Sequence, residues 1–311
     1  VGGILSCIII PCIVFTPNLA IVSAAFFSLG LCVGATDVAM NGQAVFVERA
    51  YGKAIMSSFH AVFSVGMALG AGSGALFAKF EVPLLSHLTL VAIIGGVACL
   101  AAAFYLINDT PEEEEKREKG GRFVLPTKAI IPLGIVAFCC MSGEGAMADW
   151  SAIYLNKVVG QSEYFSAIGY GVFAIAMTIG RVFGDYFTER IGKYKLMIYN
   201  SMFSVVGLVI LLSFATTGAT LVGLFLVGIG LATIVPIVYS SAGNMNGIDP
   251  SIGIAMATTI GYTGFFVGPP MIGFLSDAFG LRVGLGFVLI LFIAMLLLVI
   301  KIYLDKDKVT K

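Results

Sequence analysis

The sequence predicts an all-α membrane protein that crosses the bilayer many times, and three observations support this fold class. Hydrophobic residues make up 59% of the chain and charged residues only 12%, with a mean hydropathy of +1.00. Soluble proteins carry about 25% charged residues. Apolar stretches recur along the chain, and most reach the roughly 20 residues that a helix needs to cross the hydrocarbon core. The basic residues gather in alternate loops between these stretches.

Ten apolar stretches are predicted to be membrane-spanning helices. They lie at about 1–15, 19–47, 56–78, 84–107, 129–155, 164–184, 196–214, 220–241, 251–276 and 283–300. Each is nearly free of charge, and turn-forming or charged residues separate it from the next. Because the number is even, both ends of the chain are expected on the same side of the membrane.

Two sets of loops differ in their basic residues, and this difference predicts the orientation. One set carries only Lys79, Lys157 and Arg282 and comprises the loops 16–18, 79–83, 156–163, 215–219 and 277–282. The other set carries the remaining fifteen basic residues, counting Arg181 at the end of its span, and comprises 48–55, 108–128, 185–195, 242–250 and the tail from 301. Since basic loops stay in the cytoplasm during insertion, the second set and both chain ends are predicted to be cytoplasmic.

One charged segment, 108–128, divides the chain into two parts. Its sequence is charged and rich in turn-forming residues, so we expect a solvated cytoplasmic linker; a binding tail is the less favoured alternative. The predicted domains are a half-bundle of four helices at 1–107 and a half-bundle of six helices at 129–311.

The two parts are interpreted as repeats. The glycine pair Gly66 and Gly70 recurs as Gly264 and Gly268, although small residues at this spacing are common wherever membrane helices pack closely. Parallel repeats of six helices are a known transporter plan. Val1 lies inside an apolar run, so we expect an N-terminally truncated chain from which the first two helices are missing.

A glycine-rich motif with charges follows the sixth span. It consists of Gly180, Arg181, Gly184, Asp185, Arg190, Gly192 and Lys193. The two glycines at 180 and 184 allow close helix packing, and Asp185 is placed to cap the N-terminus of a neighbouring helix, where an anion is favourable. The basic residues at the end of the motif are expected at the cytoplasmic headgroups.

This motif resembles the G-x-x-x-D-R-x-G-R-[RK] signature of the major facilitator superfamily, with extra residues between Asp185 and Arg190. Two further stretches, 35–60 and 143–155, are similar to the bacterial MosC/YbjJ-type branch near the fucose-permease-like transporters. The resemblance implies the major facilitator fold, with ten of twelve helices present in two pseudo-symmetric half-bundles. It also implies a location in the bacterial inner membrane. The segment 273–282 fits the signature by letter, but the charge pattern places it at a periplasmic turn.

Polar side chains within the predicted spans are the candidate binding residues, because ionisable groups are costly in the membrane and are therefore functional candidates. They are Asp37, Asn41, His60, Glu144, Asp149, Trp150, Tyr154 and Tyr239. Asp37 and Asn41 are four residues apart and share a helix face. Asp37 is interpreted either as a cavity carboxylate or as an anchor to Arg49 or a neighbouring loop. His60 either titrates with transport or packs against a backbone carbonyl or Asn41.

The fifth span carries two carboxylates that are not expected to form one pair. Glu144 and Asp149 are five residues apart, which places them about 140° apart around the helix. Glu144 is flanked by glycines and is predicted to bind substrate or protons. Trp150 either belongs to the aromatic belt of the membrane or stacks on a sugar ring. Tyr239, which follows Pro236 in the eighth span, is predicted to line a cavity.

The resemblance and the polar residues together predict a secondary active transporter that works by alternating access. The expected substrate is a sugar-like or other small polar metabolite, with proton coupling through Glu144, Asp37 or His60. Efflux of amphipathic drugs is the alternative, as is a non-transporting membrane protein. No phosphate-binding loop, nucleophile–base pair or metal-binding cluster is found, so we expect neither an enzyme nor a cofactor. The expected partners are the substrate, protons and the lipid bilayer, with no nucleic acid, and the chain is expected to be monomeric.

Overall fold

The structure is a computed structural model and describes residues 1–16, 18–107 and 125–309. Every regular element in these residues is helical. The first helices are α1 (Gly2–Cys12) with the short 3-10 helix η1 (Ile13–Phe15), α2 (Leu19–Tyr51), α3 (Met56–Lys79) and α4 (Leu84–Ala103). The later helices are α6 (Ile131–Lys157), α7 (Glu163–Ile191), α8 (Lys193–Ser213), α9 (Thr217–Leu231), α10 (Ile234–Gly243), α11 (Pro250–Phe279) and α12 (Leu281–Val309).

Each of the ten predicted spans coincides with one helix, or with the consecutive helices α9 and α10. Within the described residues, seven helical segments are long and apolar enough to cross a membrane, α9 and α10 being counted together. Of the other three predicted spans, α1 is a short helix of 11 residues, and α3 and α7 are helices of 24 and 29 residues. The protein is therefore an all-α polytopic membrane protein. Most of the predicted linker 108–128 lies outside the described residues.

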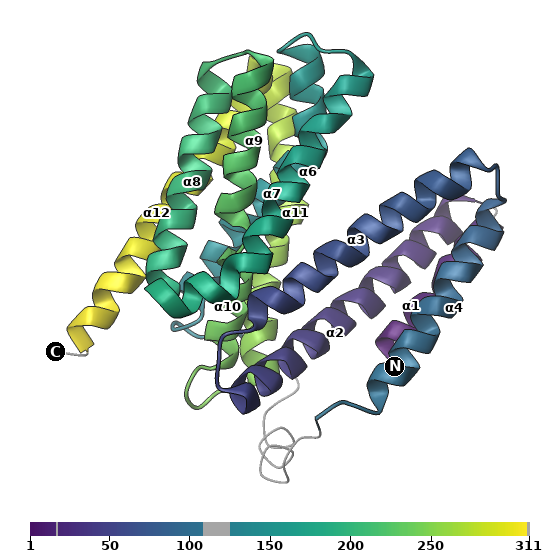
Figure 1. Cartoon of the computed structure of the whole chain (residues 1–311), viewed down its shortest axis with the longest axis horizontal. Coiled ribbons are helices and arrows are strands. Elements are labelled where there is room, and N and C mark those ends of the chain that lie inside the picture. The colour runs from purple at the N-terminus through teal and green to yellow at the C-terminus, as the bar shows by residue number, and fades with distance from the viewer. Residues whose placement is uncertain (17, 108–124, 310–311) are drawn as a thin grey trace.

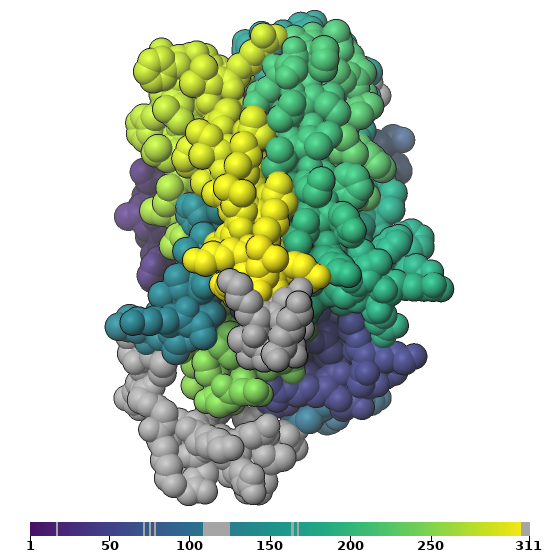
Figure 2. All heavy atoms as spheres, turned by 90° about the vertical axis from the view of Figure 1, so that its left-hand side faces the viewer, coloured from purple at the N-terminus to yellow at the C-terminus, as the bar shows by residue number. Residues whose placement is uncertain are grey.

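The helices form two bundles that meet at one end and diverge at the other (Figure 1). The first bundle contains α1–α4 and the second contains α6–α12. In the described part of the chain, almost all of the buried apolar core belongs to the second bundle, and the first bundle adds only Ala44, Val45 and Met56 to it. Figure 2 shows α12 running along one face of the second bundle between α8 and α11.

Glycines bring helices of the second bundle close together. A side chain at Gly207 of α8 or Gly223 of α9 would collide with the backbone of the other helix, which is typical of tightly packed membrane helices. Gly264 of α11 likewise packs on α6, where an added Cβ would lie 2.5 Å from a backbone oxygen. Gly66 and Gly70 have nothing within 4 Å of their Cβ positions. The two glycine pairs that suggested a repeat therefore have different packing roles.

The predicted end of the sixth span and the loop after it are wrong. The span was expected to end at 184, but α7 continues to Ile191, and only Gly192, at φ +82, separates it from α8. The charged residues of this segment do not break the helix because they occupy its exposed last turns, and a glycine tolerates the positive φ that ends it. Arg181 consequently lies within α7 and not at its end.

Candidate functional site

Asp185 of α7 caps the N-terminus of α3 and so joins the two bundles. Its Oδ1 accepts a hydrogen bond from the Ser57 amide at 2.9 Å, and its Oδ2 accepts one from the Ser58 amide at 2.7 Å. The Ser58 hydroxyl also donates to Oδ2. The first amides of a helix have no partner within the helix and carry partial positive charge, so a carboxylate is favoured there. The prediction that Asp185 caps a neighbouring helix is confirmed.

Glu48, near the end of α2, binds the amides that precede these two. One oxygen, Oε2, accepts from the amides of Ile55 and Met56 at 3.1 Å each. Its other oxygen accepts from the hydroxyl of Ser240 on α10. Two carboxylates, one from each bundle, therefore satisfy four consecutive amides at the start of α3.

Arg49 makes the complementary contact at the C-terminus of α10. Its guanidinium donates to the carbonyl oxygen of Gly243 at 2.6 Å and to Oδ1 of Asn244 at 2.7 Å. The carbonyls at a helix C-terminus carry partial negative charge, which favours a cation. Arg49 is thus bound to the second bundle, and the suggested anchor between Asp37 and Arg49 is not seen.

The glycines of the predicted motif allow these contacts to form. A Cβ at Gly184 would lie 2.7 Å from the Ser57 hydroxyl oxygen and 2.6 Å from the Thr233 methyl group. Gly180 packs against Ala232 in the same way. The prediction that small residues at these positions permit close packing is confirmed.

The last residues of the motif lie at the exposed end of α7 and the start of α8. The Arg190 guanidinium lies over the Tyr186 ring, 5.3 Å from its centroid, and the Lys193 ammonium lies 5.3 Å from the Tyr194 ring centroid. The ends of α2 and α10 meet the start of α3 and the C-terminal part of α7. We call this region the closed end.

Asp37 lies between the bundles, further along α2 from the closed end. Its Oδ1 accepts from the Asn41 amide at 3.1 Å, and its Oδ2 accepts from the Tyr262 hydroxyl of α11 at 2.6 Å. Asn41 also donates to the Asp37 backbone carbonyl at 2.9 Å. The prediction that Asp37 and Asn41 share a helix face is confirmed, and the partner on α11 is new.

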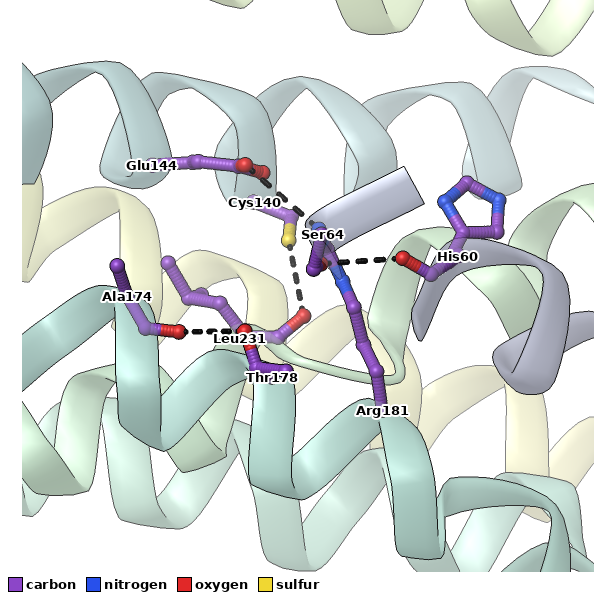
Figure 3. Close-up of polar contacts among 8 residues, drawn as sticks. All are labelled: His60, Ser64, Cys140, Glu144, Ala174, Thr178, Arg181 and Leu231. Atoms are coloured by element: carbon purple, nitrogen blue, oxygen red, sulfur yellow. Dashed lines mark hydrogen bonds and ion pairs between the residues drawn. The ribbon is translucent and has the colours of Figure 1, made fainter. Parts of the chain in front are cut away.

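Arg181 and Glu144 form a second polar cluster that also reaches the first bundle (Figure 3). The Arg181 side chain is only 5% exposed, and one nitrogen lies 3.6 Å from a carboxylate oxygen of Glu144, which is 23% exposed. A second guanidinium nitrogen donates to the hydroxyl of Ser64 on α3 at 2.6 Å. The assignment of Arg181 to the cytoplasmic charges is therefore wrong, because its helix extends beyond it and buries it against α3 and α6.

His60 lies one turn before Ser64 on α3, beside this cluster (Figure 3). Its ring centroid is 5.8 Å from that of Tyr239 on α10, so two predicted site residues meet here. Its Nε2 is buried without a hydrogen-bond partner among the described residues. The suggested bond to Asn41 or a carbonyl is thus absent at this nitrogen.

The remaining candidates on α6 are not brought into these clusters. The Tyr154 side chain is fully buried within the second bundle, where its hydroxyl donates to the Leu211 carbonyl at 2.8 Å. Asp149 is exposed. Trp150 packs near Gly273 of α11, and its Nε1 is buried without a partner in the described structure.

Sequence reasoning missed two residues of the central clusters, Ser64 and Tyr262, and assigned a third, Arg181, to the loop motif and not to the binding residues. Arg181 could have been found, since it lies inside the apolar stretch 164–184 and is a charged residue in a predicted span. Ser64 and Tyr262 carried no signal, because a serine or tyrosine in an apolar helix is ordinary. No group of three or more His, Cys, Asp or Glu side chains in the described ranges could hold a metal ion.

Comparison with known proteins identifies the family. Residues 1–247 match the family model of the Major Facilitator Superfamily. The chain belongs to this superfamily. An uncharacterised MFS-type transporter of Yersinia pestis is 36% identical over 290 residues, covering 93% of this chain and 74% of that protein. The membrane protein MosC of Rhizobium meliloti is 30% identical over 281 residues, covering 88% and 66% of the two chains.

Solved structures of the superfamily have the same fold. The fucose:proton symporter FucP of E. coli superposes with a TM-score of 0.73 at 16% identity, over 96% of this chain and 82% of that one. A bacterial homologue of the iron transporter ferroportin gives a TM-score of 0.65 at 15% identity, over 96% and 79%. The expected major facilitator fold is therefore confirmed.

Proposed function

We propose that this protein is a secondary active transporter that moves a small polar solute, such as a sugar-like metabolite, across the bacterial inner membrane by proton-coupled alternating access. The observation that carries the proposal is that two polar clusters within the membrane each draw side chains from both bundles. Asp37 meets Tyr262 across the interface, and Ser64 meets Arg181. A solute bound between such clusters contacts both bundles at once.

The position of these clusters fits a site that opens to one side at a time. On α3, Ser64 is buried, but every residue from 65 to 70 is exposed. The bundles therefore separate immediately beyond the Arg181 cluster, while the closed end seals the opposite side. The closed end contains the loops with many basic residues, so we assign it to the cytoplasm and the divergent end to the outside.

The contacts at the closed end are polar and can be replaced by contacts to water or to other polar groups. They are hydrogen bonds between charged side chains and helix ends, each contributing about 1.5–3 kcal/mol. Among the described residues, the apolar core that joins the bundles is small, because the first bundle adds three residues to it. Opening this end requires these polar contacts to break, with water or new partners replacing them.

Proton coupling needs a group that gains and loses charge inside the membrane. Asp37 and Glu144 are carboxylates within spans, and each is tied to a neighbouring helix by a polar contact. Adding a proton to either removes a charge that the membrane disfavours and weakens the contact to its partner. Both are therefore proposed to couple proton movement to the change between the two conformations.

A binding screen tests the proposal. The purified protein is heated in detergent with neutral sugars, sugar acids, inositols and amphipathic cations, at pH 5.5 and 7.5. A ligand that binds the folded state raises the apparent melting temperature. We expect stabilisation by a polar solute that is lost in Asp37→Asn and kept in the control Glu189→Gln, which changes an exposed carboxylate of α7. Stabilisation by amphipathic cations alone, unaffected by Asp37→Asn, would favour drug efflux.

A further inference from the structure

We propose that the substrate carries a carboxylate and that Arg181 binds it in place of Glu144, so that one proton on Glu144 enters with each substrate anion. This inference rests on the proposed transport function and assigns a chemical class to its substrate. It starts from a feature that the transport mechanism has not used, the unsatisfied guanidinium of a buried arginine.

Arg181 has more hydrogen-bond donors than the protein satisfies. A guanidinium has five N–H donors in a planar fork. One nitrogen donates to Ser64, a second lies 3.6 Å from Glu144, and Nε is buried without a partner in the described structure. A buried charged donor left unpaired is costly, by about 1–3 kcal/mol or more. This fork is the group that proteins use to bind a carboxylate through two parallel hydrogen bonds.

Glu144 holds this arginine loosely. Its 3.6 Å separation exceeds the 2.7–3.2 Å of a direct N–H···O hydrogen bond. Glu144 is 23% exposed whereas Arg181 is 5% exposed, so the carboxylate lies on the accessible side of the pair. An incoming carboxylate can therefore approach from the side where Glu144 now lies.

His60 and Ser64 would join the bound carboxylate to the first bundle. Both are on α3, and the buried Nε2 of His60 has no partner among the described residues. His60 is also near enough to Arg181 for their charges to interact. A ligand held by Arg181 of the second bundle and by these α3 side chains would bridge the bundles.

The displaced Glu144, which is 23% exposed here, would be left without a partner once the bundles close over the site, and an unpaired charge enclosed in the membrane is strongly disfavoured. It must take up a proton, while the substrate carboxylate stays ionised beside Arg181. The titratable groups that interact with Glu144 from the surrounding helices are Cys140 on α6, Tyr170 and Arg181 on α7, Tyr239 on α10 and Tyr262 on α11. None of these supplies a second cation to pair with Glu144.

The test uses neutral sugars paired with acids of the same skeleton: D-galactose with D-galacturonate, and D-glucose with D-gluconate. Apparent Kd values are measured by thermal stabilisation of the full chain at pH 5.5 and 7.5. The wild type is expected to bind an acid more tightly than its neutral partner, and more tightly at pH 5.5. Glu144→Gln, which mimics the protonated carboxyl, should bind the acid about tenfold or more tightly than the wild type at pH 7.5, and without pH dependence. Glu189→Gln should behave as the wild type.

Variants of Arg181 test whether its guanidinium binds the substrate carboxylate. Arg181→Gln should lose the preference for the acid, and Arg181→Lys, which keeps the charge but not the fork, should weaken it at least severalfold. Lys301→Gln, which changes an exposed cation of α12 away from both clusters and the closed end, is the control. Misfolding would weaken binding, so it cannot explain the tighter acid binding that we expect of Glu144→Gln.

The carboxylate assignment is wrong if acids and neutral sugars bind equally well, or if acid binding is unchanged by Glu144→Gln. Either result leaves the transport proposal intact. Failure of both acids to bind at either pH also overturns it. Stabilisation only by amphipathic cations contradicts both proposals.

Discussion

Asp37 shows how a single half-buried carboxylate can link two helix bundles. It accepts hydrogen bonds from Asn41 on its own helix and from Tyr262 on α11, and the second bond crosses the interface. Hydrogen bonds to charged groups contribute more than those between neutral groups. We therefore expect protonation of Asp37 to weaken this link between the bundles.

Removing the Tyr262 hydroxyl should weaken this link. We expect Tyr262→Phe to lower the free energy of unfolding by about 1.5–3 kcal/mol, because Asp37 loses its only partner on the second bundle in the described structure. Thermal unfolding in detergent measures the effect. Tyr199→Phe, on an exposed surface of α8, is the control and should change little. Equal midpoints for the two variants would contradict the role of this bond.

Asp185 is the residue whose role at the closed end is clearest. Asp185→Asn keeps a side chain of the same size but removes the charge that binds the start of α3. A loss of about 1–2 kcal/mol would raise the population open at this end by roughly five- to thirtyfold. Distances between spin labels at positions 53 and 195, after replacement of the native cysteines, measure that population.

The matched control for this variant is Asp249→Asn. Asp249 caps α11 through the amides of Ser251 and Ile252, all within the second bundle. Loss of the Asp249 charge should lower the free energy of unfolding without changing the distance between the spin labels. If Asp185→Asn gave the same distance distribution as this control, the proposed closing role of Asp185 would be wrong.

At the scale of elements, the break between α9 and α10 is the main irregularity of the second bundle. α9 ends at Leu231 and α10 begins at Ile234. Neighbouring helices provide partners at the break: the Cys140 thiol of α6 lies 3.6 Å from the Leu231 carbonyl, and the Asn200 amide of α8 donates to the Thr233 hydroxyl at 2.7 Å. Such replacement of lost partners is what allows a helix to break inside the membrane.

Thr233→Val should therefore be markedly destabilising. It removes the acceptor of Asn200, which is buried and would keep an unpaired amide at a cost of about 1–3 kcal/mol. Thr259→Val, an exposed position whose hydroxyl bonds only to its own helix, is the control. Thermal unfolding of both variants distinguishes them, and similar melting temperatures would show that the Asn200 contact does not stabilise the break.

The elements themselves could be predicted from the sequence, because membrane helices follow directly from the length of apolar runs. Helix ends were less predictable. The charges at 185–195 suggested a loop, yet α7 continues through them to Ile191 because a helix of 29 residues is longer than the hydrocarbon core. The same error counted Arg181 with the cytoplasmic loop charges and hid the cluster with Glu144.

At the scale of the whole molecule, the site depends on contacts between residues far apart in the chain. Asp37 and Tyr262 are 225 residues apart, and Ser64 and Arg181 are 117 apart. Hydrophobic patterns fix which residues are helical but not which helices pack together. The capping role of Asp185 was predictable because two glycines before it allow close helix packing and an anion is favourable at a helix N-terminus, whereas Tyr262 had no such context and was not predicted.

The arrangement of the two bundles is compatible with the alternating access that we propose. Among the described residues, the second bundle carries most of the apolar core, while the first bundle meets it mainly through polar contacts at the closed end and at the two central clusters. Movement of one bundle against the other changes those contacts and leaves the core intact. Our account therefore places both substrate binding and proton binding at the interface.

The most direct test of this account is solute flux into proteoliposomes with an imposed proton gradient, using the solute found in the binding screen. We predict accumulation that ends when the gradient is collapsed, that falls at least tenfold in Asp37→Asn and in Glu144→Gln, and that is unchanged in Glu189→Gln. Accumulation that persists without the gradient, or that neither central substitution reduces, would contradict proton-coupled transport through the interface of the two bundles.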